Sequence, residues 1–589
     1  MPKELPSILT IDWLRTAYAR REWTPDEVVR AIVRRAEKDG DFRVWITPPH
    51  YDAIRPYLDR LSAMDPAACP LWGVPFAVKD NIDWSGITTT AGCPDFAYVP
   101  EANAAAVERL LAAGAIPLGK TNLDQFATGL VGTRSPYGEA RNALRPELIS
   151  GGSSSGSAVA VARGHAAFAL GTDTAGSGRV PAALNGIVGW KPSLGAWPVR
   201  GIVPACASLD CVTVFACRLG DALAVDRAVR GPDPLDPWSK AAPPLSPRPP
   251  MRILVPDIRL AFFGPFAEPY EEAWNRSLDR LAARGFELVP TNIQPLLEAA
   301  EMLYEGPFVE ERWAGLGDFV ESHPGSLLPV TEKVLRSGAT RGFGAASAFR
   351  AMHLLQARKL EVGRMLRDAA LALPTVGGTW TREDVRADPI GTNSRLGMYT
   401  NHCNLLNLCA AAVPAGEALE GLPFGLSFFS VSGREDLAFG AAAAFLGEDL
   451  GAEPVPVSSG TTLVAVCGLH MRGFPLERQM EACGARFVKE ARTSSQYRMY
   501  ELPTTPAKPG LVKRPGEGSP LRLEVWEMPL ASFGPFVAAI PSPLGIGKVE
   551  LEDGTEVPGF LCESYAAAGA SDITARGGWK PERQAKRCD

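Results

Sequence analysis

The chain has 589 residues and a formal net charge of −6 at pH 7. This length exceeds one ordinary domain, and the acidic balance argues against nucleic acid or an anionic membrane surface as the main partner. No apolar run reaches the roughly 18 residues of a membrane-spanning helix, and the N-terminus lacks the pattern of a secretory signal. Eleven cysteines are dispersed without a C-x-x-C pair, which favours reduced thiols over disulfides or a zinc site. We therefore predict a cytoplasmic protein with no membrane or nucleic-acid partner.

The predicted elements begin with helices in residues 1–40, where "TPDEVVRAIVRRAEK" opens on a threonine cap and an acidic first turn. From about residue 70, apolar strands alternate with helices. The alternation runs through "GVPFAVKD" (73–80), "ANAAAVERLLAAGAIPLGKTN" (102–122), "SGSAVAVARG" (155–164), "AAFALGTD" (166–173) and "RVPAALNGIVGWKP" (179–192). This pattern indicates an α/β fold, in which a large mixed β-sheet is flanked by helices on both faces.

A proline-rich connector at 231–250 precedes the second half of this domain. We expect that half to return to the same sheet, because "AAAVPAG" and "LPFGLSFFS" again resemble buried strands. Residues 452–461 are predicted to be a linker, after which short strands with turn signals follow. The predicted domains are therefore 1–455, which contains the connector, and a small, mainly β, α+β domain at 462–582.

The serine-rich run "SGGSSSGSAVA" (150–160) raises the question of a nucleophile. Ser154 fits G-x-S-x-G, but that motif needs a strand directly before it and a catalytic aspartate and histidine after it. The preceding residues, "ARNALRPELIS", contain a proline and no strand-like run, and none of the six histidines lies in a recognisable catalytic loop. Taken alone, the run is best explained as a turn that caps the following helix.

A second small-residue turn, "GTDTAGSGRVPAA" (171–183), directly follows an apolar strand and contains Ser177. Small residues let a backbone approach a substrate, and the N–H groups that could surround an oxyanion are those of Thr174, Ala175, Gly176 and Ser177. Upstream, Lys79 ends the apolar strand "VPFAV". Burial would lower its pKa toward the neutral amine, which is a base. The alternative is a surface lysine whose ammonium reaches solvent.

Together, "GVPFAVKDN", "GGSSSGS" and "GTDTAGSGRVPA" resemble, in this order, the motifs of the amidase signature family. The resemblance implies Ser177 as nucleophile, Ser153 as bridging serine and Lys79 as base, with the peptide bond before Ser153 in the cis form. Neutral Lys79 would take a proton from Ser153, which would take one from Ser177. No metal or organic cofactor is needed. Asp173 and Arg179 are expected to fix the turn, the alternative being an ordinary ion pair.

Three further features resemble the allophanate hydrolase family: "YTNHCNLLNLCAAAVPAG" in place of the usual N-x-x-G-x-P, the segment "EMLYEGPFVEERW", and the extra C-terminal domain. The resemblance implies recognition of allophanate, which is urea with a carboxylate on one nitrogen. It implies that Tyr304 and Arg312 bind the carboxylate of allophanate, and their spacing of eight residues would let both face one side of a helix. It also implies that the backbone of Gly129 lines the substrate pocket. Alternatively, Arg312 forms a surface ion pair with Glu310 or Glu311, and Tyr304 is a core aromatic.

The C-terminal domain resembles the γ-glutamyl-cyclotransferase-like domain of the same family, to which the family assigns decarboxylation of N-carboxycarbamate. Within "CGLHMRGFPL" we expect His470 to be its functional residue, because a histidine can move a proton near neutral pH. The resemblance also suggests a homodimer and a functional link to urea carboxylase or to enzymes of the cyanuric-acid pathway. Two other functions stay open: an amidase of another small amide with a purely structural C-terminal domain, and a component of an assembly like the tRNA transamidases.

Overall fold

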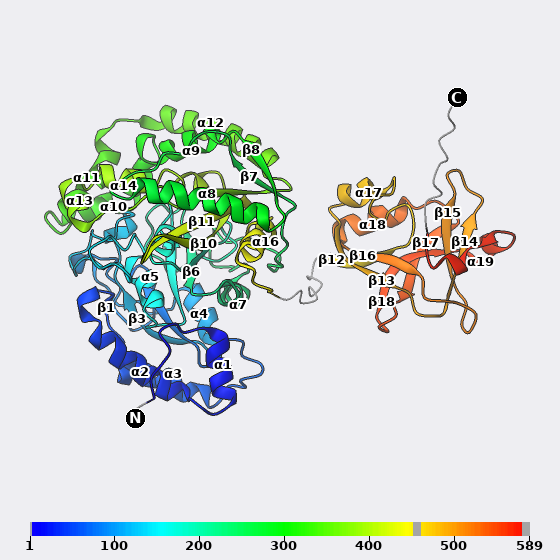
Figure 1. The fold of residues 1–589 in the computed structure, drawn as a ribbon, viewed down its shortest axis with the longest axis horizontal. Helices are drawn as coiled ribbons and strands as arrows, with labels where there is room; N and C mark the ends of the chain where they lie inside the picture. Colours follow the sequence, from blue (N-terminus) through cyan, green and yellow to red (C-terminus); the bar gives the residue numbers. More distant parts are fainter. Residues whose placement is uncertain (1–2, 451–460, 580–589) are drawn as a thin grey trace. The chain divides into compact units, whose positions relative to one another are not determined.

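The computed structural model describes residues 3–450 and 461–579. The chain divides into two compact units, residues 1–453 and 454–589 (Figure 1). The predicted linker at 452–461 lies outside the described residues except for Thr461, which is the first residue of a strand. The predicted fold class is confirmed, because unit 1 holds a large mixed sheet with helices and unit 2 holds smaller sheets.

Unit 1 is built on one sheet of eleven strands. In their order across the sheet these are β1 (Trp45–Thr47), β3 (Ile116–Thr121), β2 (Pro75–Lys79), β4 (Phe168–Asp173), β6 (Cys211–Ala216), β5 (Val188–Lys191), β10 (Leu408–Leu419), β11 (Leu422–Val431), β9 (Ala370–Pro374), β7 (Arg252–Pro256) and β8 (Glu287–Thr291). β2 is parallel to β3 and β4, and β7 is parallel to β8 and β9. The ladders from β4 through β9 are antiparallel. The long β10–β11 hairpin thus returns the second half of the unit to the sheet, as predicted.

Helices pack against this sheet, with α5 against β4, α7 against β6, and α8 and α16 against β10. The helices of unit 1 are α1 (Ile11–Ala19), α2 (Pro25–Lys38), α3 (Tyr51–Leu61), α4 (Ala105–Ala112), α5 (Ser155–Ala162), α6 (Val180–Leu184), α7 (Leu219–Val229), α8 (Ala267–Ala283), α9 (Gln294–Glu305), α10 (Val309–Ser322), α11 (Pro329–Thr340), α12 (Gly344–Met365), α13 (Arg382–Ala387), α14 (Gly391–Leu396), α15 (His402–Leu405) and α16 (Glu435–Leu446). Because helices cover the sheet, strands such as β2 and β4 are buried along their whole length.

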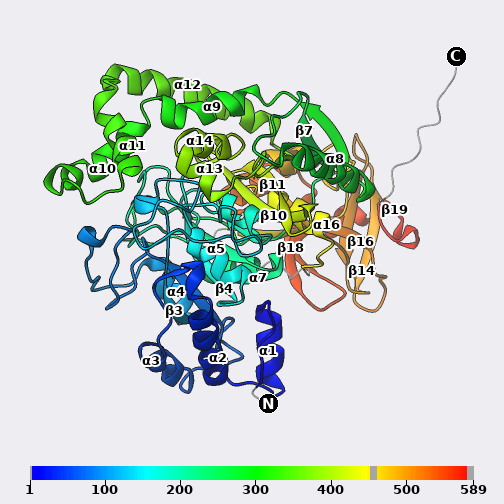
Figure 2. The ribbon, with the colours of Figure 1, turned by 60° about the vertical axis from the view of Figure 1, so that its left-hand side comes forward.

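The N-terminal helices form where the sequence predicts them. Thr24 caps α2 by accepting a hydrogen bond from the N–H of Glu27, and the Glu27 carboxylate accepts one from the N–H of Thr24, which completes a capping box. Gly114 has a φ of 90° and separates α4 from β3. Figure 2 and Figure 1 both place α1–α3 at one end of unit 1 and α9–α12 at the other. The four helices α9–α12 were not predicted individually.

Unit 2 is a mainly β, α+β domain. Its five-stranded sheet contains, in order, β13 (Arg486–Arg492), β16 (Arg522–Pro529), β12 (Thr461–Val466), β18 (Glu556–Cys562) and β17 (Leu544–Glu550). A three-stranded sheet contains β15 (Lys508–Lys513), β14 (Tyr497–Leu502) and β19 (Ser571–Asp572). Three helices complete the unit: α17 (Glu477–Ala482), α18 (Leu530–Ala538) and α19 (Ser564–Ala567). Unit 2 has its own hydrophobic core, which includes Val464, Met480, Leu523 and Val525.

Candidate active site

Lys79 is the last residue of β2, and its side chain is fully buried. Its Nζ lies 2.8 Å from Oγ of Ser153 and 2.7 Å from Oγ1 of Thr172. Burial lowers the pKa of Lys79 to about 7, against the opposing effect of nearby carboxylates led by Asp124. The alternative of a surface lysine is therefore wrong. The amine is partly neutral near pH 7 and can accept a proton from Ser153.

Thr172 orients this amine, although sequence reasoning did not single it out. Its Oγ1 accepts hydrogen bonds from Lys79 and, at 3.3 Å, from the amide of Asn81. A neutral amine has two N–H donors and one lone pair, so donation to Thr172 leaves the lone pair free for the hydroxyl of Ser153. The sequence does hold a signal for this residue, because Thr172 is a polar side chain inside a fully buried strand.

The serine-rich run begins with a cis peptide bond between Gly152 and Ser153. Ser153 is fully buried and contacts Lys79, whereas Ser154 turns to the backbone of β4. Its hydroxyl donates to the carbonyl of Thr172 at 3.2 Å and accepts from the N–H of Thr172 at 3.3 Å. It makes no hydrogen bond that caps α5. The geometry therefore fits neither a nucleophile elbow nor a helix cap at Ser154.

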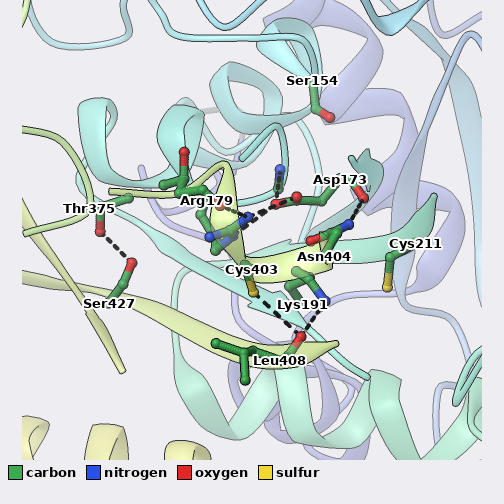
Figure 3. A network of polar contacts seen from close by, with 12 residues as sticks. Ser154, Asp173, Arg179, Lys191, Cys211, Thr375, Cys403, Asn404, Leu408 and Ser427 are labelled. Atoms are coloured by element: carbon green, nitrogen blue, oxygen red, sulfur yellow. Dashed lines mark hydrogen bonds and ion pairs between the residues drawn. The ribbon is translucent and has the colours of Figure 1, made fainter. Parts of the chain in front are cut away.

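Ser177 lies in the turn between β4 and α6, and a buried ion pair joins the two ends of this turn (Figure 3). Arg179 donates to both carboxylate oxygens of Asp173 at 2.9 Å, and also to the carbonyl of Thr400 at 3.2 Å. The backbone N–H of Gly178 donates to the same carboxylate at 3.0 Å. A bidentate pair of this kind fixes orientation as well as distance, so the backbone around Ser177 is held on both sides.

The turn leaves backbone donors free. In the part of the chain that the structure describes, the N–H groups of Ala175, Gly176 and Ser177 donate to no acceptor. Gly176 has a φ of 151°, and a Cβ there would lie 2.4 Å from Oγ1 of Thr400, so only glycine fits. Unpaired N–H groups beside a serine are the arrangement that stabilises a tetrahedral oxyanion.

Asp210, the residue before β6, supports the same turn. The hydroxyl of Thr174 donates to one of its oxygens, and two backbone N–H groups donate to the other at 2.8 and 3.1 Å. Burial raises the pKa of Asp210 to about 6. The amide of Asn404 donates to the carbonyls of Asp173 and Leu209 at 2.7 Å, which ties the two strand ends together (Figure 3).

The structure brings Lys79 and Ser153 into contact, but it does not join Ser153 to Ser177. Ser177 is 3% exposed, and among the described residues no hydrogen bond connects its hydroxyl with that of Ser153. Catalytic hydrogen bonds are often longer before a substrate is bound. Of the three predicted relay residues, Lys79 and Ser153 are thus in contact, and Ser177 lies in the turn that follows β4.

Tyr304 and Arg312 lie on two successive helices, so the prediction that they share one helix is wrong. Tyr304 is in the last turn of α9 and Arg312 in the first turn of α10. Gly306 and Pro307 separate the helices, because a residue that precedes proline disfavours the helical region and Gly306 is extended. The two side chains still meet, since Nη2 of Arg312 donates to the hydroxyl of Tyr304 at 3.2 Å.

Arg312 is buried and 1% exposed, and it forms no ion pair among the described residues. Its Nη1 donates to Oγ1 of Thr128 at 3.1 Å, and its Nε has no acceptor. Glu311 instead accepts two hydrogen bonds from Ser208 at 2.7 Å, and Glu310 accepts one from a backbone N–H. An ion pair of Arg312 with either glutamate is therefore excluded. The guanidinium is free to bind an anion.

Asp124 links the loop that holds Gly129 to the serine-rich run. Its carboxylate accepts two backbone N–H groups of that loop at 3.0 and 2.8 Å. A Cβ on Gly129 would lie 2.6 Å from Oδ2 of Asp124, and one on Gly152 would lie 2.0 Å from it, so both positions require glycine. Sequence reasoning missed Asp124, whose signal is a charged residue within the buried segment "NLDQFATG".

His470 lies in unit 2, in the loop after β12, and lines a cavity of about 410 Å³. Its Nε2 is 2.9 Å from Oε1 of Gln479, and its ring stacks on Phe560 with centroids 5.0 Å apart. Burial lowers the pKa of His470 below its ordinary value. The structure therefore places His470 beside a cavity, as a neutral imidazole at pH 7.

Within residues 3–450 and 461–579, no three histidine, cysteine or carboxylate side chains come together as metal ligands. The ten cysteines in these ranges are free thiols, and most are buried. None of the helices there is both long enough and apolar enough to cross a membrane.

Comparison with known proteins gives two family matches. The Amidase model matches residues 27–438, and the model of the allophanate hydrolase C-terminal domain matches residues 462–584. The chain is 41% identical to the urea amidolyase of Lachancea kluyveri over 544 residues, which are 87% of this chain but 30% of that protein. It therefore spans about a third of the length of this relative. The urea amidolyase of Saccharomyces cerevisiae is 40% identical over 546 residues, which are 87% of this chain and 29% of that protein.

Among solved structures, the Kluyveromyces lactis allophanate hydrolase matches with a TM-score of 0.81 and 38% identity, over 97% of this chain and 98% of that chain. The similarity thus extends over both units. The chain belongs to the amidase family, whose members hydrolyse carbon–nitrogen amide bonds, and it is an allophanate hydrolase-like amidase with the C-terminal domain of that group.

Proposed function

We propose that the chain hydrolyses allophanate, releasing ammonia at Ser177 and decarboxylating the product in its C-terminal domain. The observation that carries this proposal is Arg312, a buried guanidinium without a carboxylate partner among the described residues. A buried charge is costly unless an opposite charge accompanies it. Allophanate has a carboxylate to meet this guanidinium and a primary amide for the nucleophile.

The first step uses the relay Lys79–Ser153–Ser177. Neutral Lys79 takes the proton of Ser153, Ser153 takes that of Ser177, and Oγ of Ser177 attacks the amide carbon. The second transfer requires a hydrogen bond between the hydroxyls of Ser153 and Ser177, which we expect to form when substrate binds. Backbone N–H groups of the turn, those of Thr174, Ala175 and Gly176, hold the oxyanion. Asp173 and Arg179 keep the turn in shape.

Protons then return along the relay to the leaving nitrogen, and ammonia departs from the acyl-enzyme. Water hydrolyses the ester on Ser177, which gives N-carboxycarbamate. The balance of this step is allophanate plus water to N-carboxycarbamate plus ammonium.

Recognition of the substrate uses the group around Arg312. Its fork can donate two hydrogen bonds to one carboxylate, while Tyr304 adds a hydroxyl donor and the backbone of Gly129 lines the pocket. Thr128 precedes Gly129 and binds Nη1 of Arg312 at 3.1 Å, which supports the placement of Gly129 next to the guanidinium. The second step, loss of carbon dioxide from N-carboxycarbamate, is assigned to the cavity of unit 2 and to His470.

Product analysis tests this function. Complete turnover of allophanate by the full chain should yield two ammonia and two carbon dioxide molecules per substrate. The other amidase function, on a different small amide with a purely structural C-terminal domain, predicts instead a higher kcat/KM for neutral amides across a substrate panel. Binding of tRNA at physiological salt would favour the assembly function, which the acidic charge disfavours.

We also propose that the enzyme is a cytoplasmic homodimer that acts together with urea carboxylase or with enzymes of the cyanuric-acid pathway. A urea amidolyase relative three times longer than this chain supports a link to urea breakdown. Light scattering on the purified full chain tests the dimer, which would have about twice the 62.9 kDa chain mass.

A further inference from the structure

The cavity of unit 2 has an apolar wall and one charged side chain. Phe536, Leu544 and Phe560 represent the apolar part, and Lys508 is the charged residue. No aspartate or glutamate is among the described residues that line it. A concave, mostly apolar site with a few polar groups is typical of small-molecule binding, and here the charge in its wall is positive.

Lys508 differs from the other described lysines of unit 2. Each of those pairs with a carboxylate: Lys489 with Asp553 at 3.3 Å, Lys513 with Glu550 at 2.8 Å, and Lys548 with Glu556 at 3.3 Å. Among the described residues, no carboxylate pairs with Lys508 and no acceptor takes a hydrogen bond from it. Lys508 is only partly exposed. Its ammonium therefore sits at a mostly apolar cavity without a partner in the protein.

His470 cannot supply the positive charge in place of Lys508. Burial and the neighbouring ammonium of Lys508 lower the pKa of His470, so its ring is neutral at pH 7. The loop that holds His470 lies against the start of β15, because a Cβ on Gly468 would come within 2.4 Å of the ring of Pro509. Lys508 and His470 thus face the same small volume from two neighbouring segments.

We propose that Lys508 binds one carboxylate of N-carboxycarbamate in this cavity, while the other carboxylate lies against the apolar wall and leaves as carbon dioxide. The proposal rests on the function proposed above. Charge-assisted contact with Lys508 holds the retained carboxylate. The departing carboxylate loses its charge as carbon dioxide forms, and an apolar surrounding disfavours the charged reactant more than the neutral product.

The step balances without any further reactant except a proton. The bond between nitrogen and the departing carbon breaks, and its electron pair stays on nitrogen. The carbon leaves as carbon dioxide, and the nitrogen takes one proton from solvent, which gives carbamate. His470 lines the same cavity; as a neutral imidazole it donates its one N–H to Oε1 of Gln479, so its other ring nitrogen is an acceptor.

The test follows ¹³C-labelled allophanate by NMR at early times and alkaline pH, where spontaneous loss of carbon dioxide is slowest. In the full chain, Lys508→Gln should keep the initial rate of ammonia release within about twofold, while N-carboxycarbamate persists at least about tenfold longer than with wild type. Lys508→Arg should restore most of the decay rate, because it restores the charge. Lys548→Gln is the matched control, since that lysine is exposed and paired, and it should behave as wild type.

Decay of N-carboxycarbamate at the wild-type rate in Lys508→Gln would overturn the proposal, and so would a loss that Lys508→Arg does not restore at all. A second measurement is independent of the amidase step. Malonate, in which CH2 replaces NH, is titrated calorimetrically into Arg312→Gln, so that the carboxylate site of unit 1 is removed. Adding Lys508→Gln to Arg312→Gln should weaken malonate binding at least about tenfold. Equal affinity in the two proteins would refute the role of Lys508. This result does not depend on whether the chain releases ammonia from allophanate, so it is distinguishable from a failure of the proposed function.

Discussion

The pH dependence of ammonia release should report the protonation of Lys79. Its pKa of about 7 leaves half of the amine neutral at pH 7, whereas an ordinary lysine with a pKa of about 10.4 is neutral to roughly 0.04% at that pH. Burial therefore increases the available base by about a thousandfold. Because only the neutral amine accepts a proton from Ser153, kcat/KM should rise about tenfold per pH unit below pH 6 and level off above pH 8.

The assay is steady-state ammonia release between pH 5.5 and 9, with a neutral amide measured beside allophanate. Both substrates should show the same rising limb, because Lys79 acts on Ser153 and not on the carboxylate end. Lys79→Arg should be inactive throughout, since a guanidinium does not deprotonate in this range. A profile that stays flat from pH 5.5 to 9 would refute the assignment of Lys79 as the base.

Asp210, which supports the turn that holds Ser177, also has a pKa within this window, at about 6. The variant Asp210→Asn distinguishes whether the protonation of Lys79 or that of Asp210 sets the pH profile. A nearby negative charge stabilises the ammonium of Lys79 and raises its pKa, so removal of the charge should move the rising limb to lower pH without abolishing it. Disappearance of the limb in Asp210→Asn, with activity kept, would mean that Asp210 and not Lys79 controls the profile.

Three other outcomes follow from the same geometry. Ser177→Ala should abolish ammonia release in an ammonia assay while circular dichroism shows an unchanged fold. Ser154→Ala should stay active, because the hydroxyl of Ser154 is hydrogen-bonded to a strand backbone. The reverse result would reject Ser177 as the nucleophile. Arg312→Lys should lower kcat/KM for allophanate by about tenfold to a hundredfold and leave a neutral amide nearly unaffected, and equal losses on both substrates would indicate a structural role. A chain ending near residue 453 should release ammonia but accumulate N-carboxycarbamate at early times in ¹³C NMR. His470→Ala in the full chain should behave in the same way. If both variants and the wild type give the same products over time, unit 2 has no decarboxylase role.

The residues of the predicted relay could be singled out from the sequence because they sit in short, continuous motifs. Lys79 ends an apolar strand and Ser177 follows another, and the carboxyl ends of adjacent parallel strands meet at one edge of a sheet. The pairing of Lys79 with Ser153 was expected from the resemblance to the amidase signature family, and the structure shows the two side chains in contact. The burial of Lys79 was also predictable, because β2 lacks the alternation of apolar and polar residues that indicates a strand with one face in solvent.

Contacts between distant segments were not predictable in this way. Thr172 and Asp124 stand out as polar residues within apolar segments, but their partners depend on which loops fold against Lys79 and Gly152. The helix break between Tyr304 and Arg312 could have been found, because Gly306–Pro307 is a local signal against a continuous helix. In spite of that break, the packing of the two helices places Nη2 of Arg312 3.2 Å from the hydroxyl of Tyr304.

Lys79 and Arg312 are both buried cations, yet burial leaves them in opposite charge states. An ammonium concentrates its charge on one nitrogen, so the loss of hydration lowers the pKa of Lys79 to about 7. A guanidinium starts above 12 and spreads its charge over three nitrogens, and although burial opposes it, neighbouring groups such as Tyr304 and Asp210 leave the pKa of Arg312 raised. Burial therefore leaves Lys79 able to accept a proton near pH 7, whereas Arg312 keeps its charge. An arginine in place of Lys79 would not accept a proton, and a lysine in place of Arg312 would lose the planar fork and part of its charge. Under the proposed function, the chemistry of each residue type therefore suits it to one end of the substrate.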